Sequence, residues 1–176
     1  MTSEAPATAD ATAALIARLA ERGLTVAVAE SLTGGLLVAE LIRPPGASAV
    51  VFGGVVAYAT ELKRTVLGVD GELLAQFGPV DPEVARQMAS GVRTALAVDG
   101  RVADIGISTT GVAGPDPQGG KAAGTVYVGL STKDGARALE LQLDGDRTTI
   151  RNATVAAAIA LIGDAEKSTT SPVADL

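Results

Sequence analysis

A serine and a lysine in one stretch of the sequence could together perform nucleophilic chemistry. Ser48 follows Pro-Pro-Gly, Lys63 follows further along the same stretch, and Tyr58 lies between them. The chain contains no histidine and no cysteine, so it has neither an imidazole base nor a thiolate nucleophile. These residue types therefore favour a hydroxyl nucleophile whose proton is taken by a neutral lysine.

The protonation state of Lys63 decides whether such a pair can work. An ordinary lysine, with a pKa of about 10.4, is charged at neutral pH and cannot act as a base. The sequence predicts a helix over 61–67, whose dipole disfavours the charged form of a lysine in its first turn. Arg64 and partial burial would lower the pKa of Lys63 further, and Glu61 would raise it. The alternative is that Ser48 caps a turn and Lys63 is a solvated helix residue, because the sequence does not show their contact.

The segment ESLTGG (30–35) is a candidate anion site, because it follows a predicted strand and opens a predicted helix. Helix starts expose backbone N–H groups that bind anions. We therefore expect Ser31, Thr33, Gly34 and Gly35 to contact substrate, the last three as candidates for binding a phosphate. The segment matches neither the P-loop nor the dinucleotide-binding pattern. The alternative is a tight strand-to-helix turn in which Ser31 or Thr33 is the N-cap.

Two further segments offer substrate contacts. Thr110 and Gly111 lie at the predicted end of a strand, where ligands collect in open α/β sheets. Arg147 and Arg151 share one face of the predicted last helix and could hold a phosphate or a carboxylate. The alternatives are a Gly/Pro loop whose threonines bond to their own backbone, and arginines that are simply solvated.

The composition limits the classes of function. The chain has 176 residues, 47% of them hydrophobic and 19% charged, as in a folded globular domain. A net charge of −6 and very few aromatic residues argue against a general nucleic-acid binder. The first ten residues are polar, no apolar run is long enough for a membrane span, and there is no cysteine, so we expect a cytoplasmic protein without membrane contact. The aspartate spacings match no metal-binding loop, so we expect no metal site.

The elements that must position these residues follow from periodicity and from the Gly, Pro and capping signals. We expect strands over 24–29, 50–59, 101–109, 123–131 and 136–143, and helices over about 10–22, up to 42, 61–67, 71–77, 82–98 and 147–162. Strands that alternate with helices early, followed by a late hairpin, predict a three-layer α/β/α sandwich with a mixed, mainly parallel sheet. We expect a loose leader at 1–10, a single domain at 11–163 and a polar, disordered tail at 164–176.

Five segments occur along the chain in the order AESLTGG, GASAVVFGGVVAYATELK, STTGVAGPDP, GTVYVGL and GDRTTIR. Together they resemble the C-terminal domain of the CinA family of nicotinamide-nucleotide amidohydrolases (NMN deamidases), and the likeness extends over roughly 11–163. The resemblance implies hydrolysis of the carboxamide of nicotinamide mononucleotide to nicotinate mononucleotide and ammonia, with no metal or organic cofactor. It also implies a homodimer and a stand-alone domain, since the partner domain of longer CinA proteins has no counterpart here.

The resemblance assigns roles to individual residues. It makes Ser48 the nucleophile and Lys63 the base, with Tyr58 close to both. It places Thr110 and Arg147 in the lining of the site. Two alternative functions are a nucleotide-binding module without catalysis and a serine amidase for another small amide.

Overall fold

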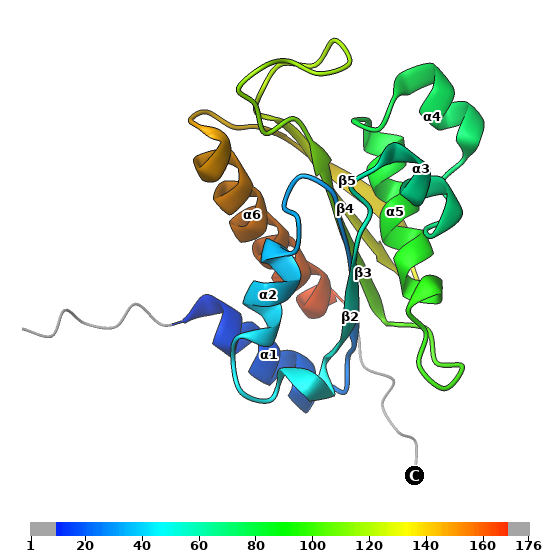
Figure 1. Ribbon diagram of the computed structural model, residues 1–176. Helices are drawn as coiled ribbons and strands as arrows, with labels where there is room; N and C mark the ends of the chain where they lie inside the picture. Colours follow the sequence, from blue (N-terminus) through cyan, green and yellow to red (C-terminus); the bar gives the residue numbers. More distant parts are fainter. Residues whose placement is uncertain (1–9, 169–176) are drawn as a thin grey trace, which may run out of the picture.

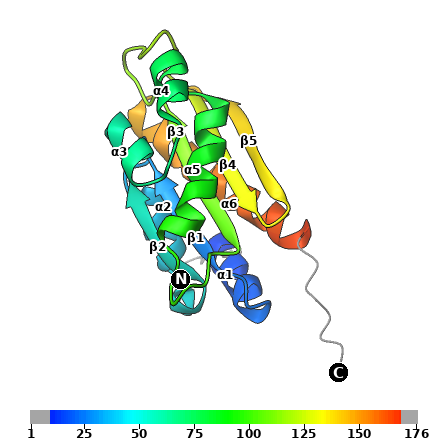
Figure 2. The same cartoon turned by 90° about the vertical axis from the view of Figure 1, so that its right-hand side faces the viewer.

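The computed structural model describes residues 10–168, which form one sheet with helices on both faces (Figures 1 and 2). The order of the elements is α1 (Ala11–Glu21), β1 (Val26–Glu30), α2 (Leu36–Ile42), η1 (Ala47–Ala49), β2 (Val51–Val56), α3 (Thr60–Thr65), α4 (Gly71–Phe77), α5 (Pro82–Ala95), β3 (Ile105–Gly111), β4 (Thr125–Thr132), β5 (Gly135–Gln142) and α6 (Arg147–Ser168). None of the described helices is long and apolar enough to cross a bilayer.

The five strands lie in the order β2-β1-β3-β4-β5. β1 pairs in parallel with both β2 and β3, while β3–β4 and β4–β5 are antiparallel. The predicted mixed sheet and the predicted hairpin are confirmed, although the four pairings divide evenly and are not mainly parallel. The register of β1 and β2 shifts between Val26 and Ala27, where Val26 faces Val51 and Ala27 faces Gly53.

The predicted three layers are present. Figure 1 shows α1, α2 and α6 on one face of the sheet and α3, α4 and α5 on the other. β1 is buried at every position because it lies in the middle of the sheet with both faces covered. Val26 and Val28 pack toward α1, α2 and α6, whereas Ala27 and Ala29 pack toward α5. This alternation fixes the face to which each side chain at the end of β1 points.

Two glycines let α5 lie directly on the sheet. A Cβ atom on Gly106 of β3 would come within 1.9 Å of the Ala89 carbonyl oxygen, and one on Gly129 of β4 within 2.1 Å of the Ala85 oxygen. Any side chain at these positions would push α5 away from the sheet. The close contact therefore sets the position of the segment that precedes α5, which lines the candidate site described below.

The C-terminal boundary of the domain differs from the prediction, because α6 continues to Ser168 and residues 164–168 of the predicted tail are helical. At the other end α1 begins at Ala11, where the predicted domain begins, and Asp10 is its N-cap, accepting a hydrogen bond from the Ala13 amide at 3.1 Å. The remaining parts of the predicted leader and tail, 1–9 and 169–176, lie outside the described residues.

Candidate active site

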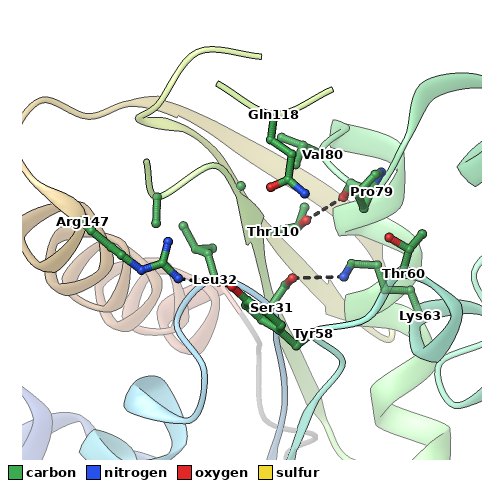
Figure 3. A pocket seen from close by; sticks show the side chains of 12 residues that line it. Ser31, Leu32, Tyr58, Thr60, Lys63, Pro79, Val80, Thr110, Gln118 and Arg147 are labelled. Carbon is green, nitrogen blue, oxygen red and sulfur yellow. Dashed lines mark hydrogen bonds between the residues drawn. The ribbon is translucent and has the colours of Figure 1, made fainter. Parts of the chain in front are cut away.

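The structure pairs Lys63 with Ser31. The Nζ atom of Lys63 lies 3.0 Å from the Ser31 Oγ atom (Figure 3). It also donates a hydrogen bond of 2.7 Å to the Ala57 carbonyl oxygen. Ser31 directly follows β1, and Ala57 directly follows β2. The two strands are parallel, so both ends lie at the same edge of the sheet, and α3 brings Lys63 to that edge.

The Lys63 ammonium is poorly solvated. The residue has a relative exposure of 0%, and this burial lowers its pKa from 10.5 to about 8. Within residues 10–168, no carboxylate forms an ion pair with it; the neighbouring Arg64 and Glu61 pair with each other at the surface. At pH 7 roughly one lysine in ten is then neutral, far more than for a solvated side chain.

The predicted pair of Ser48 and Lys63 is wrong. Ser48 is exposed on η1, which comes before β2, whereas Lys63 comes after it. A strand rises about 3.3 Å per residue, so β2 separates the two residues by roughly 20 Å. Ser48 therefore lies at the opposite edge of the sheet from Lys63, and Ser31 is the hydroxyl within its reach.

A pocket of about 100 Å³ opens in front of this pair. It lies at the carboxyl ends of the parallel strands, where ligands bind in open α/β sheets. Figure 3 shows α6 on one side of it, α3 on the other and Ser31 between them. The lining residues are Ser31, Leu32, Tyr58, Thr60, Lys63, Pro79, Val80, Thr110, Gly111, Ala113, Gln118 and Arg147.

Tyr58 and Arg147 form the rim of the pocket. One guanidinium nitrogen of Arg147 donates to the Tyr58 hydroxyl at 3.2 Å, and another donates to the Gly114 carbonyl at 3.1 Å. Tyr58 is 62% exposed and, among the described residues, makes no hydrogen bond with Ser31 or Lys63. Tyr58 nevertheless lines the same pocket as Ser31 and Lys63, and Arg147 lines it as predicted.

Thr110 and Gly111 both line the pocket, as predicted from their place at the end of β3. The Thr110 hydroxyl donates a hydrogen bond of 2.6 Å to the Pro79 carbonyl. Its proton is therefore already engaged by a backbone acceptor. The bond instead ties β3 to the segment that leads into α5.

The predicted phosphate site at the start of α2 is already occupied by a side chain. The fully buried Glu30 carboxylate accepts hydrogen bonds of 3.0 Å from the Gly35 and Leu37 amides and of 2.9 Å from the Val38 amide. Glu30, rather than Ser31 or Thr33, thus satisfies the helix start. The Thr33 hydroxyl bonds to another buried hydroxyl and does not face the pocket lining. The prediction that Thr33, Gly34 and Gly35 bind a phosphate is therefore wrong.

A tight turn carries Ser31. The Ser31 carbonyl accepts a hydrogen bond of 3.1 Å from the Gly34 amide, and the Ser31 amide donates to the Thr109 carbonyl at 3.0 Å. Within residues 10–168, no acceptor bonds to the Leu32 or the Thr33 amide. These two N–H groups are the unpaired backbone donors next to the Ser31 hydroxyl.

Arg151 does not line the pocket, although we had expected it to contact substrate. Its Nε atom donates to the Leu32 carbonyl at 2.9 Å, and its Nη2 atom donates to the Thr33 carbonyl at 3.0 Å. The guanidinium therefore binds the Ser31 turn from the α6 side.

Gln118 is a lining residue that the sequence analysis missed. It belongs to a two-residue turn in which the amides and carbonyls of Gln118 and Lys121 bond to each other at 3.0 Å. Gly119 and Gly120 between them have φ values of 56° and 74°, which glycine adopts without strain. The sequence Gln-Gly-Gly-Lys was the available signal. Figure 3 shows the Gln118 amide pointing toward Thr110.

The CinA C-terminal domain model matches residues 8–165 of the chain. The chain belongs to the CinA C-terminal domain family. It is 49% identical over 144 residues to a CinA-like protein of Frankia casuarinae, and the aligned region covers 82% of this chain and 32% of that protein. It is 48% identical over 141 residues to a putative competence-damage inducible protein of Desulforamulus reducens, and the aligned region covers 80% of this chain and 33% of that protein. The chain thus spans about a third of the length of these CinA relatives.

Solved CinA structures have the same fold. A CinA superfamily protein of Klebsiella pneumoniae superposes with a TM-score of 0.83 at 31% identity, covering 91% of this chain and 98% of that one. A competence/damage inducible protein of Agrobacterium tumefaciens gives a TM-score of 0.78 at 35% identity, covering 94% of this chain and 99% of that one. The pocket with Ser31 and Lys63 is therefore built on the CinA C-terminal fold.

Proposed function

We propose that this chain hydrolyses the carboxamide of nicotinamide mononucleotide to nicotinate mononucleotide and ammonia, with Ser31 as the nucleophile and Lys63 as the general base. One observation carries the proposal: a fully buried lysine without a carboxylate partner lies 3.0 Å from a serine hydroxyl at the floor of a pocket. A lysine that is easily deprotonated next to a hydroxyl suits acyl transfer, in which the hydroxyl must lose its proton as it attacks a carbonyl.

In the first step, neutral Lys63 accepts the Ser31 proton while the Ser31 oxygen attacks the carboxamide carbon. The Ala57 carbonyl holds one N–H of the amine, which directs the nitrogen toward the hydroxyl. The carbonyl oxygen of the substrate becomes an oxyanion. The Leu32 and Thr33 amides, which have no acceptor among the described residues, are its candidate donors.

In the second step, the Lys63 ammonium returns its proton to the leaving nitrogen, ammonia departs, and a nicotinoyl ester of Ser31 remains. A water molecule then attacks the ester with Lys63 again as the base. This attack releases nicotinate mononucleotide and restores the Ser31 hydroxyl. Proton transfer by such a positioned base typically contributes about 100- to 10,000-fold to the rate.

The dimensions of the site fit a substrate that is only partly enclosed. A pocket of about 100 Å³ can take a carboxamide and part of its ring, whereas pockets that enclose a drug-sized ligand measure roughly 300–1,000 Å³. The ribose phosphate would then lie at the rim, where Arg147 retains N–H groups beyond those that bond to Tyr58 and Gly114. A chain of net charge −6 needs such a local cation to attract an anionic substrate.

The resemblance to nicotinamide-nucleotide amidohydrolases supports the choice of nicotinamide mononucleotide over other amides. The proposal also includes a homodimer and a cytoplasmic location, as the same resemblance and the composition lead us to expect.

Ammonia release from nicotinamide mononucleotide tests the proposal against its two rivals. We expect the purified protein to release ammonia and nicotinate mononucleotide, and Ser31→Ala to release neither. Nucleotide binding without ammonia release would favour a binding module. Ammonia release from unrelated small amides, but not from this nucleotide, would favour an amidase of another specificity.

A further inference from the structure

We propose that Arg151 is a positioning residue for the nucleophile and does not bind substrate. The inference rests on the proposed role of Ser31. Arg151 donates to the carbonyls of Leu32 and Thr33, the two residues that follow Ser31 in its turn, at 2.9 and 3.0 Å. The pocket lining does not include Arg151.

Peptide geometry links this contact to the unpaired amides. In a trans peptide, the C=O and the N–H of one unit point in opposite directions. Because the Leu32 carbonyl points to Arg151, the Thr33 N–H of the same unit points away from Arg151. The Ser31 carbonyl bonds to the Gly34 amide inside the turn, so the Leu32 N–H points out of the turn. Arg151 thus sets the direction of a backbone donor beside the Ser31 hydroxyl.

The turn is held from two sides by opposite charges. Glu30 accepts three amides of the chain that leaves the turn, and Arg151 donates to two carbonyls within it. Among the described residues, neither side chain forms an ion pair. Both charges are therefore directed at the backbone, which fixes the turn more rigidly than neutral contacts would.

The local geometry suits arginine in particular. Gly34 lies beside the guanidinium, since a Cβ atom there would be in van der Waals contact with the Arg151 Nη2 atom at 3.4 Å, and its φ of 59° favours glycine. The planar guanidinium fork matches two neighbouring carbonyls, whereas a lysine ammonium offers a single point of contact. Arg151 also lies near the positive start of α6, where the helix dipole disfavours a cation. Its position is explained by the two carbonyls, not by the helix.

The bound cation also polarises the peptides that it contacts. A carbonyl that accepts a charged hydrogen bond makes the N–H of its own peptide a stronger donor. The stronger N–H donor stabilises the substrate oxygen more as negative charge develops on it. The interaction therefore lowers the free energy of the transition state more than that of the bound substrate, and its loss lowers kcat.

The experiment compares Arg151→Gln and Arg151→Lys with the wild type and with Arg137→Gln, which removes an exposed arginine on β5. We expect Arg151→Gln to lower kcat for nicotinamide mononucleotide about 10- to 100-fold, the cost of a small misplacement of reacting groups, with KM within about 2-fold. The pH midpoint of the reaction should not move, because Lys63 is untouched. Arg151→Lys should recover part of kcat, and Arg137→Gln should match the wild type.

A second measurement does not depend on the substrate. The rate at which a fluorophosphonate probe labels Ser31 should fall in parallel with kcat, and added guanidinium ion should restore part of the labelling in Arg151→Ala. If the wild type labels at Ser31 but releases no ammonia from the nucleotide, the proposed substrate fails, and the labelling rates alone decide the role of Arg151.

Other outcomes overturn the inference. A raised KM with an unchanged kcat would make Arg151 a substrate-binding residue. Unchanged kcat and labelling in both folded variants would leave it without a role in positioning. Arg151→Gln could fail to fold, as judged by circular dichroism, and the test then rests on Arg151→Lys. A folded Arg151→Lys whose labelling rate and kcat equal those of the wild type would overturn the inference.

Discussion

Replacing Lys63 by methionine should change the pH dependence of stability as well as abolish hydrolysis. Methionine has a similar length and no charge, so the core remains filled while the buried cation disappears. Lys63 has a pKa of about 8 when folded and an ordinary value of 10.5 when unfolded. Between these values the unfolded chain carries a proton at this residue that the folded chain lacks. Unfolding then takes up a proton, so the wild type becomes more stable as the pH rises through this window.

The magnitude follows from the two pKa values. Linkage gives the wild type about 2 kcal/mol of additional unfolding free energy between about pH 7 and about pH 9.5. The methionine variant lacks this gain and also leaves the Ala57 carbonyl without its donor, a loss of about 1–3 kcal/mol that does not depend on pH. At pH 7 the wild type carries a penalty of about 3 kcal/mol for its buried charge, so the two proteins should then be of similar stability.

Urea unfolding at several values from about pH 6.5 to 9.5 measures this difference. Other groups that titrate in the range are common to both proteins and cancel when the two curves are subtracted. Lys133→Met is the matched control, because Lys133 is exposed in the β4–β5 turn, and its curve should follow the wild type. Parallel curves for the wild type and Lys63→Met would show that the ammonium is not desolvated in the folded protein. The account of Lys63 as a base would then lose its physical cause.

Three more outcomes follow from the site. Ser31→Ala should lower the rate of ammonia release by at least about 1,000-fold, while Ser48→Ala should keep the wild-type rate; equal losses in both would refute the pairing with Ser31. The value of kcat/KM should rise with pH to a plateau with a midpoint near the Lys63 pKa of about 8, and a profile flat from about pH 6 to 9 would exclude Lys63 as the base. Arg147→Gln should raise KM for nicotinamide mononucleotide about 10-fold and change the KM of the phosphate-free nucleoside much less, as steady-state assays with both substrates would show.

The sequence predicted the layers of the fold because periodicity, proline, glycine and capping residues act locally. It also identified Lys63, since the absence of histidine and cysteine left few bases. It did not identify the partner of Lys63, because that contact depends on which strand ends share an edge of the sheet. Residues that follow the carboxyl ends of neighbouring parallel strands lie close together. Lys63 follows β2 and Ser31 follows the parallel strand β1, whereas Ser48 precedes β2.

The start of α2 was mispredicted for a related reason. Exposed helix amides bind anions only where no side chain reaches them first, and the sequence gives no direct sign of which side chain does. Glu30 reaches three of them from the strand before the helix. The clue was its place at the end of an apolar strand, where an acidic residue is expensive to bury without donors.

The alternation of side chains along β1 explains how a buried glutamate and a buried lysine can lie on either side of Ser31 without neutralising each other. Val26 and Val28 point toward α1, α2 and α6, so Glu30 points to that face as well and reaches the α2 amides. Ala27 and Ala29 point to the opposite face. The Ser31 side chain, two residues further on, points to the same face and contacts Lys63 of α3. A carboxylate beside Lys63 would raise its pKa and keep it protonated. Because Glu30 and Ser31 point to opposite faces of the sheet, the Glu30 carboxylate binds the α2 amides and does not contact Lys63. Burial alone then lowers the pKa of Lys63, which is the condition that a lysine base requires.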